Sequence, residues 1–187
     1  MNRTGGVIGA KTFGVIGWSN SGKTTLLIGL VAELVHRGWR VSTMKHGHHD
    51  FDVDKPGKDS YRHRQAGATE VLVSSARRWA LMHELRGTPE ERMEDLLAHM
   101  SPVDLVLTEG FKSHPHDKLE VHRPGLGQPL ICLDDPTVVA VASDEALANV
   151  ALPVLDVNDV VAIADFISRH CGLGPHAATE ETDAETR

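Results

Sequence analysis

The sequence predicts an α/β fold with a mostly parallel central sheet flanked by helices. Residues 12–17 form a short apolar run that ends in glycine, and after a glycine-rich loop leucine and valine recur at helical spacing over residues 26–35. Gly38 is the expected end of that helix, and residues 39–44 are predicted as the next strand. Such a strand, helix and strand in succession is the repeating unit of parallel sheets.

Further strands are predicted along the rest of the chain. Residues 70–73 and 79–82 are apolar runs on either side of a turn, so they could pair as a β-hairpin extension of the fold. The remaining predicted strands are residues 104–108, residues 118–122 as an edge strand, the buried run 138–142 and residues 153–156.

Capping signals and helical spacing predict three more helices. One covers residues 59–66, and another has Thr88 at its N-cap in a capping box and runs to about Met100. Asn158 is the expected cap of the last helix. The apolar stripe of that helix comprises Val160, Val161, Ile163, Ala164 and Ile167.

The loop between the first strand and the first helix has the sequence GWSNSGKTT and satisfies the phosphate-binding pattern GxxxxGK[ST], the P-loop. Backbone N–H groups of such a loop surround phosphates, while Lys23 would bind the outer two and the Thr24 hydroxyl would ligate Mg²⁺. A P-loop NTPase-type fold is therefore expected. The predicted nucleotide-binding residues in the loop are Gly17, Trp18, Ser19, Asn20, Ser21, Gly22, Lys23, Thr24 and Thr25.

P-loop proteins also need an acidic group at the end of a neighbouring buried strand, to hold Mg²⁺ or a water molecule. Glu109 follows the predicted strand 104–108 and is the candidate, so Lys23 and Glu109 are the predicted catalytic residues. The alternative is a strand-end carboxylate that is merely solvated.

The loop of residues 46–59 follows the second strand and begins at the same carboxyl edge as the phosphates, where a switch segment would lie. Asp54 and Asp59 are both candidates to complete the Mg²⁺ shell, without a choice between them. The loop also holds His46, His48 and His49, a histidine cluster that suggests a transition metal, although no cysteine lies near it.

Asp144 lies just after the predicted strand 138–142. Its carboxylate could accept the two N–H donors that a guanine edge presents and adenine lacks, which favours GTP over ATP. The usual guanine-recognition pattern Asn-Lys-x-Asp is absent, and Asp144 is equally well explained as the N-cap of a following helix.

Composition excludes several other classes of function. The 187 residues carry a formal net charge of −7 without a run of Lys or Arg, so no nucleic-acid partner is expected. No apolar run is long enough for a membrane span, and Cys132 and Cys171 form no CxxC pair, which fits a reducing cytoplasm. We assign residues 1–11 to a flexible N-terminus, 12–172 to one P-loop nucleotide-binding domain and 173–187 to a disordered acidic tail.

Three stretches resemble the molybdopterin-guanine dinucleotide biosynthesis protein B (MobB) family. These are the loop GWSNSGKTT, the block from Lys45-His46 through Pro56-Gly57-Lys58-Asp59-Ser60 to Ala66-Gly67-Ala68, and Thr108-Glu109-Gly110-Phe111-Lys112 ahead of Glu120-Val121-His122-Arg123. The resemblance implies a GTP-binding homodimer with weak hydrolysis. Its role would be to assist a MobA-type guanylyltransferase that attaches GMP to molybdopterin, the transfer itself belonging to that partner.

Two other functions stay open. A metallochaperone-type GTPase is suggested by the histidine cluster, and a small-molecule kinase is suggested because P-loop folds transfer phosphate to many acceptors. No clear arginine finger or catalytic glutamine is present, so hydrolysis should be slow; Arg62 and Arg64 are the possible substitutes.

Overall fold

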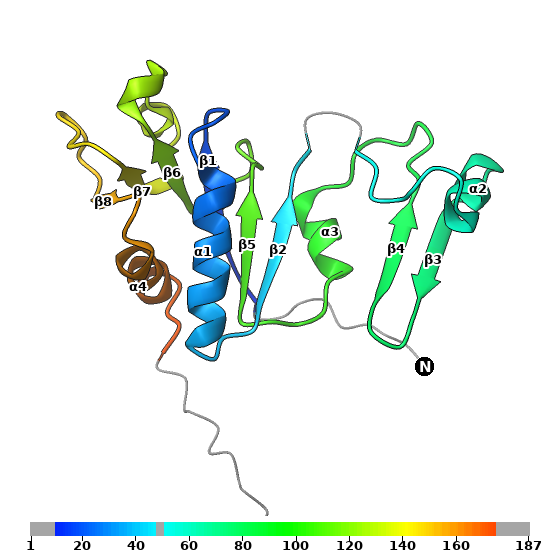
Figure 1. Ribbon diagram of the computed structural model, residues 1–187. Coiled ribbons are helices and arrows are strands. Elements are labelled where there is room, and N and C mark those ends of the chain that lie inside the picture. The colour runs from blue at the N-terminus through cyan, green and yellow to red at the C-terminus, as the bar shows by residue number, and fades with distance from the viewer. Residues whose placement is uncertain (1–9, 48–50, 175–187) are drawn as a thin grey trace, which may run out of the picture. The chain divides into compact units, whose positions relative to one another are not determined.

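The computed structural model describes residues 10–47 and 51–174, which form two compact units (Figure 1). Of the described residues, 10–46 and 97–174 form one unit, and 47 and 51–96 form the other. The segment that follows the second strand forms the smaller of the two units.

A six-stranded sheet forms the centre of the larger unit, with the strand order β2-β5-β1-β6-β7-β8 (Figure 1). All its neighbouring strands are parallel, which confirms the predicted fold class. The strands are β1 (Lys11–Gly17), β2 (Val41–Lys45), β5 (Leu105–Glu109), β6 (Lys118–His122), β7 (Val138–Ser143) and β8 (Val154–Asp156).

Two helices, α1 (Lys23–His36) and α4 (Val160–His170), contribute to the main core of this unit. Alternate residues of the strands, such as Phe13 and Leu107, pack with Leu30 and Ile167 in one apolar cluster. The apolar stripe of α4 was predicted correctly for Ile163, Ala164 and Ile167, but Val161 is 53% exposed. Two short 3₁₀ turns, η1 (Pro124–Leu126) and η2 (Ile131–Leu133), follow β6.

The prediction that residues 118–122 form an edge strand was wrong. β6 lies between β1 and β7, and all five of its residues are buried. Its charged side chains are buried with partners: Lys118 contacts Asp135 and Thr137, and the Glu120 carboxylate accepts hydrogen bonds from two backbone N–H groups. Charged residues that have such partners can occupy an interior strand, so the polar pattern alone was misleading.

Two helix starts also differ from the prediction. The third helix, α3, spans only Met93–Ala98, because the Thr88 hydroxyl donates to the carbonyl of Leu85 at 2.6 Å within a turn. The last helix is capped by Asp159, whose Oδ1 accepts from the backbone N–H of Ala162 at 2.9 Å. Asn158 instead donates to Asp156, in the turn that precedes the helix.

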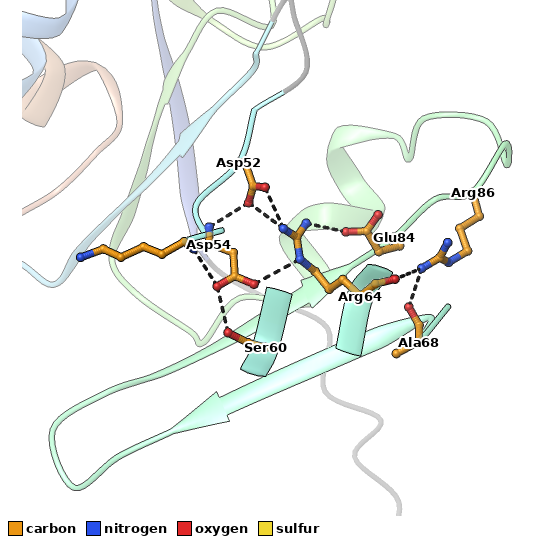
Figure 2. Close-up of polar contacts among 8 residues, drawn as sticks. Asp52, Asp54, Ser60, Arg64, Ala68, Glu84 and Arg86 are labelled. Atoms are coloured by element: carbon orange, nitrogen blue, oxygen red, sulfur yellow. Dashed lines mark hydrogen bonds and ion pairs between the residues drawn. The ribbon is translucent and has the colours of Figure 1, made fainter. Parts of the chain in front are cut away.

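The smaller unit contains α2 (Asp59–Gln65) and the antiparallel strands β3 (Glu70–Ser74) and β4 (Trp79–His83). The predicted hairpin is therefore confirmed as a two-stranded sheet. Arg64, on α2, connects the segment of Asp52 and Asp54 to Glu84, the residue after β4, because its guanidinium contacts all three carboxylates (Figure 2). No helix among the described residues is long and apolar enough to cross a membrane.

Candidate nucleotide-binding site

The loop after β1 has the geometry that a phosphate-binding loop requires. β1 ends at Gly17 and α1 begins at Lys23, so the loop leads directly into the N-terminus of a helix. A Cβ atom at Gly17 would lie 2.4 Å from the carbonyl oxygen of Val121, a distance that excludes any side chain. Gly22 has φ +97°, in the left-handed region that glycine adopts without strain.

The structure brings Glu109 beside Thr24, 85 residues away along the chain, and close enough to Lys23 to affect its pKa. The Thr24 hydroxyl donates to Glu109 Oε1 at 2.8 Å, and Lys23 Nζ donates to the carbonyl oxygen of Trp18 at 2.7 Å. Glu109 is 7% exposed and ends β5, the neighbour of β1 in the sheet. Hydroxyl and carboxylate oxygens side by side are suitable ligands for Mg²⁺.

Lys45, for which no individual role was predicted, also lies at this site. It ends β2 on the other side of β5, and its Nζ lies 3.1 Å from Glu109 Oε1. The pKa of Lys23 is lowered, first by burial and then by the positive charges of Lys112 and Lys45, while Glu109 opposes the shift. Three lysines thus act on one site, which favours a polyanionic ligand.

Trp18 and Ser21 show how the loop is held. The Trp18 indole N–H donates to the carbonyl oxygen of Pro129 at 2.7 Å, and Lys112 Nζ lies 4.7 Å from the centre of the Trp18 ring. The Ser21 hydroxyl is buried and has no hydrogen-bond partner within the described part of the chain. A buried hydroxyl without a hydrogen-bond partner destabilises the folded protein. Its presence here is consistent with a loop whose polar groups bind a ligand.

Ser19, Asn20 and Thr25 are the remaining residues predicted to bind the nucleotide. Ser19 and Asn20 are exposed at the tip of the loop, and Thr25 is exposed in the first turn of α1. Asn20 has φ 64°, a left-handed conformation that asparagine tolerates better than most residues.

Asp144 directly follows β7. In the sheet, β6 lies between β7 and β1, the strand that leads into the phosphate loop. The alternative that Asp144 caps a helix was wrong, because residues 144–153 form no helix. Its Oδ2 instead accepts from Arg123 Nη1 at 2.5 Å. The same arginine donates through Nε to the carbonyl oxygen of Ser21 at 2.9 Å, a role that no local pattern indicated.

The turn after Glu109 is tightly packed. Gly110 has φ +87°, and a Cβ atom there would lie 3.2 Å from the Cβ of His46. Phe111 is buried with φ 51°, a conformation rare for an aromatic residue, and its ring lies 5.2 Å from that of His46. His46 is thus part of this packing, whereas His48 and His49 lie outside the described residues.

Asp54 and Asp59, the two predicted switch carboxylates, belong to the smaller unit. Asp54 accepts from the hydroxyl of Ser60 at 2.9 Å and from Arg64, whereas Asp59 is exposed and contacts only Arg62 at 3.7 Å among the ion pairs described. Among the residues that the structure describes, no group of three or more His, Cys, Asp or Glu side chains could hold a metal ion.

A family model, Molybdopterin guanine dinucleotide synthesis protein B (MobB), matches residues 12–144. The chain belongs to the MobB family. It is 48% identical over 153 residues to the molybdopterin-guanine dinucleotide biosynthesis adapter protein of Escherichia coli (strain K12), which covers 80% of this chain and 87% of the relative. The corresponding Haemophilus influenzae protein is 45% identical over 157 residues, with 82% of this chain and 85% of the relative covered.

Solved MobB structures have the same fold. A crystal structure of molybdopterin-guanine biosynthesis protein B superposes with a TM-score of 0.68 at 25% identity, covering 85% of this chain and 99% of that chain. Bacillus subtilis MobB gives a TM-score of 0.67 at 25% identity, with coverages of 86% and 98%. The family resemblance expected from the three sequence stretches is therefore confirmed.

Proposed function

We propose that this MobB family member is a GTP-binding adapter in the synthesis of molybdopterin guanine dinucleotide. The relatives from Escherichia coli and Haemophilus influenzae bear the name of adapter proteins in this synthesis. The single observation that carries nucleotide binding is the P-loop with Thr24 hydrogen-bonded to the buried Glu109. On this proposal the chain binds GTP in the cytoplasm and assists a MobA-type enzyme, which performs the guanylyl transfer.

The oxygen donors of the site suit Mg²⁺, which would shield the charge between the phosphates of GTP. Thr24 and Glu109, which are hydrogen-bonded to each other, would hold the ion. Lys23, Lys45 and Lys112 would neutralise the phosphates, a role consistent with the effect of Lys45 and Lys112 on the pKa of Lys23.

Hydrolysis by this site should be slow. Arg64, one of two candidates for an arginine finger, is 12% exposed, and its guanidinium is engaged by the carboxylates of Asp52, Asp54 and Glu84 (Figure 2). These contacts raise its pKa and leave few N–H donors for a phosphate. Without such a group the rate falls by roughly 10³ to 10⁵. A nucleotide-binding adapter needs no faster turnover.

The guanine part of the proposal depends on Asp144. One of its carboxylate oxygens contacts Arg123, and a carboxylate still has lone pairs for the N1–H and N2–H donors of guanine. Adenine has no such pair of donors, so the site should prefer GTP to ATP.

Calorimetric titration of the full chain with GTP, GDP and ATP in the presence of Mg²⁺ tests the proposal. We expect guanine-selective binding, and we expect Lys23→Ala to weaken it by at least about tenfold, because a charge-assisted contact to phosphate is lost. Preference for ATP would contradict the guanine assignment and would favour a kinase. Equal GTP binding by Lys23→Ala would show that the nucleotide does not bind at this loop.

A further inference from the structure

Arg123 is the residue directly after β6, and it contacts two loops that belong to different strands. Its Nε donates to the carbonyl oxygen of Ser21 in the phosphate loop at 2.9 Å, and its Nη1 donates to Asp144 Oδ2 at 2.5 Å. The guanidinium also lies against Gly22, since a Cβ atom there would be 3.4 Å from Arg123 Nη2. All these residues lie in the larger unit.

The order and register of the strands explain why this position reaches both loops. β6 lies between β1 and β7, with Val121 opposite Gly17 and His122 opposite Ser143. The next residue, Arg123, is therefore flanked by the phosphate loop on one side and by Asp144 on the other. The planar guanidinium can donate in both directions at once, which the single ammonium of lysine cannot do with the same geometry.

We propose that Arg123 is a positioning residue that couples the phosphate loop to Asp144, so that the triphosphate and the guanine edge of one nucleotide are bound cooperatively. This inference rests on the proposed GTP-binding function and assigns the residue that connects its two halves. Holding Asp144 in one orientation before the ligand arrives lowers the entropy cost of recognition.

Charge supports the same role. Asp144 without a partner would be a free negative charge at the rim of a site that binds a polyanion. The guanidinium of Arg123 offsets that charge beside the loop where Lys23, Lys45 and Lys112 already act. Loss of Arg123 should therefore weaken both recognition of the base and attraction of the phosphates.

The test compares three probes on the full chain: GTP, ITP, which lacks the 2-amino group that Asp144 would bind, and inorganic tripolyphosphate, which has no base. The variants are Asp144→Ala, Arg123→Lys and Arg123→Gln. Arg40→Lys is the matched control, because Arg40 makes a bidentate pair with Asp104, at 3.2 and 2.9 Å, just before β2 and β5 and hence at the opposite edge of the sheet. Thermal unfolding of each variant checks that it is folded.

Wild-type protein should prefer GTP to ITP by about tenfold or more, as expected for a hydrogen bond to a charged group. Asp144→Ala and both Arg123 variants should abolish this preference for GTP. Only the Arg123 variants should also weaken the binding of tripolyphosphate several-fold. Arg40→Lys should resemble the wild type with all three probes. An Arg123 variant that binds all three probes more weakly but keeps the preference for GTP would overturn the coupling, and so would one that binds like the wild type. Equal binding of GTP and ITP by the wild type would instead refute guanine recognition by Asp144, and the coupling with it.

Discussion

Individual side chains of the site are held by partners that also adjust their chemistry. Glu109 is nearly buried, yet it keeps two polar partners, the hydroxyl of Thr24 and the ammonium of Lys45. The ammonium of Lys45, 3.1 Å from Glu109 Oε1, lies beside the carboxylate without covering it completely, since the Thr24 hydroxyl contacts the same oxygen. The carboxylate is thus available for a metal ion or a water molecule beside the phosphate loop.

Glu109→Gln tests that role directly. Glutamine keeps the shape and an acceptor for Thr24 but lacks the charge that Mg²⁺ requires, so we expect GTP hydrolysis to fall by about 10- to 100-fold. Binding of GTP in EDTA should change little. Phosphate release and calorimetry measure the two quantities, and unchanged hydrolysis would show that Glu109 only supports the loop.

His116 is a residue whose protonation should affect stability. Its Nε2 lies 2.9 Å from the hydroxyl of Thr108, and burial, with smaller effects from Lys118 and His114, lowers its pKa to about 4. In the unfolded chain a histidine titrates near pH 6.5. Between these two pH values the unfolded chain binds a proton that the folded protein does not, so the stability contributed by His116 is intact above pH 6.5 and is lost as the pH falls towards 4.

His116→Gln should remove that part of the pH dependence, because glutamine can still contact Thr108 but does not titrate. Urea unfolding of both proteins at about pH 7, 5.5 and 4.5 gives the comparison. The difference in unfolding free energy between wild type and variant should shift in favour of the variant as the pH falls. A difference that is the same at all three pH values would contradict the assignment.

At the scale of elements, α4 shows how one helix can carry both essential and dispensable apolar residues. Ile167 is fully buried in the core cluster, whereas Val161, on the same helix, is 53% exposed. The two residues are six positions apart and therefore differ by about 120° around the helix axis, so Val161 lies outside the buried face although the sequence pattern included it in the apolar stripe. The stability of the larger unit should therefore depend on the first far more than on the second.

Ile167→Ala is expected to lower the unfolding free energy by about 2–5 kcal/mol, because the lost side chain leaves a cavity. Val161→Ala is the matched control on the same helix and should change it by less than about 1 kcal/mol. Chemical denaturation monitored by circular dichroism measures both. Similar losses in the two variants would mean that α4 does not pack as described.

At the scale of the whole molecule, the hairpin is the best candidate for contact between two copies of the chain. Leu72 pairs with Leu81, and Ser74 pairs with Trp79, which puts three large apolar side chains on one face. Leu72 and Trp79 are 60% and 64% exposed. Exposed apolar patches of this kind commonly mark interaction sites.

Trp79→Lys should therefore convert the expected homodimer into a monomer, since it places a charge in the apolar face. Arg78→Lys, in the adjacent turn, is the control and should leave the dimer intact. Light scattering of both variants gives the mass. A wild-type protein with the mass of one chain would refute the dimer itself, and a Trp79→Lys dimer would exclude this face as the interface.

The sequence alone determined the features that depend on neighbours along the chain. The phosphate loop follows from one run of nine residues, the hairpin from two runs around a turn, and the position of Glu109 from the apolar strand before it. The fold class also followed, because a strand, helix and strand in succession lead to a parallel sheet. These signals are local, so they can be read without coordinates.

Only the tertiary structure decided the contacts that strand order and register create. The interior position of β6 and the link from Arg123 to Ser21 and Asp144 both bring together segments that are separated along the chain. The polar residues of β6 indicated an edge strand because their buried partners were unknown. Which side chains meet across parallel strands depends on the order of those strands in the sheet, and no local sequence pattern specifies that order.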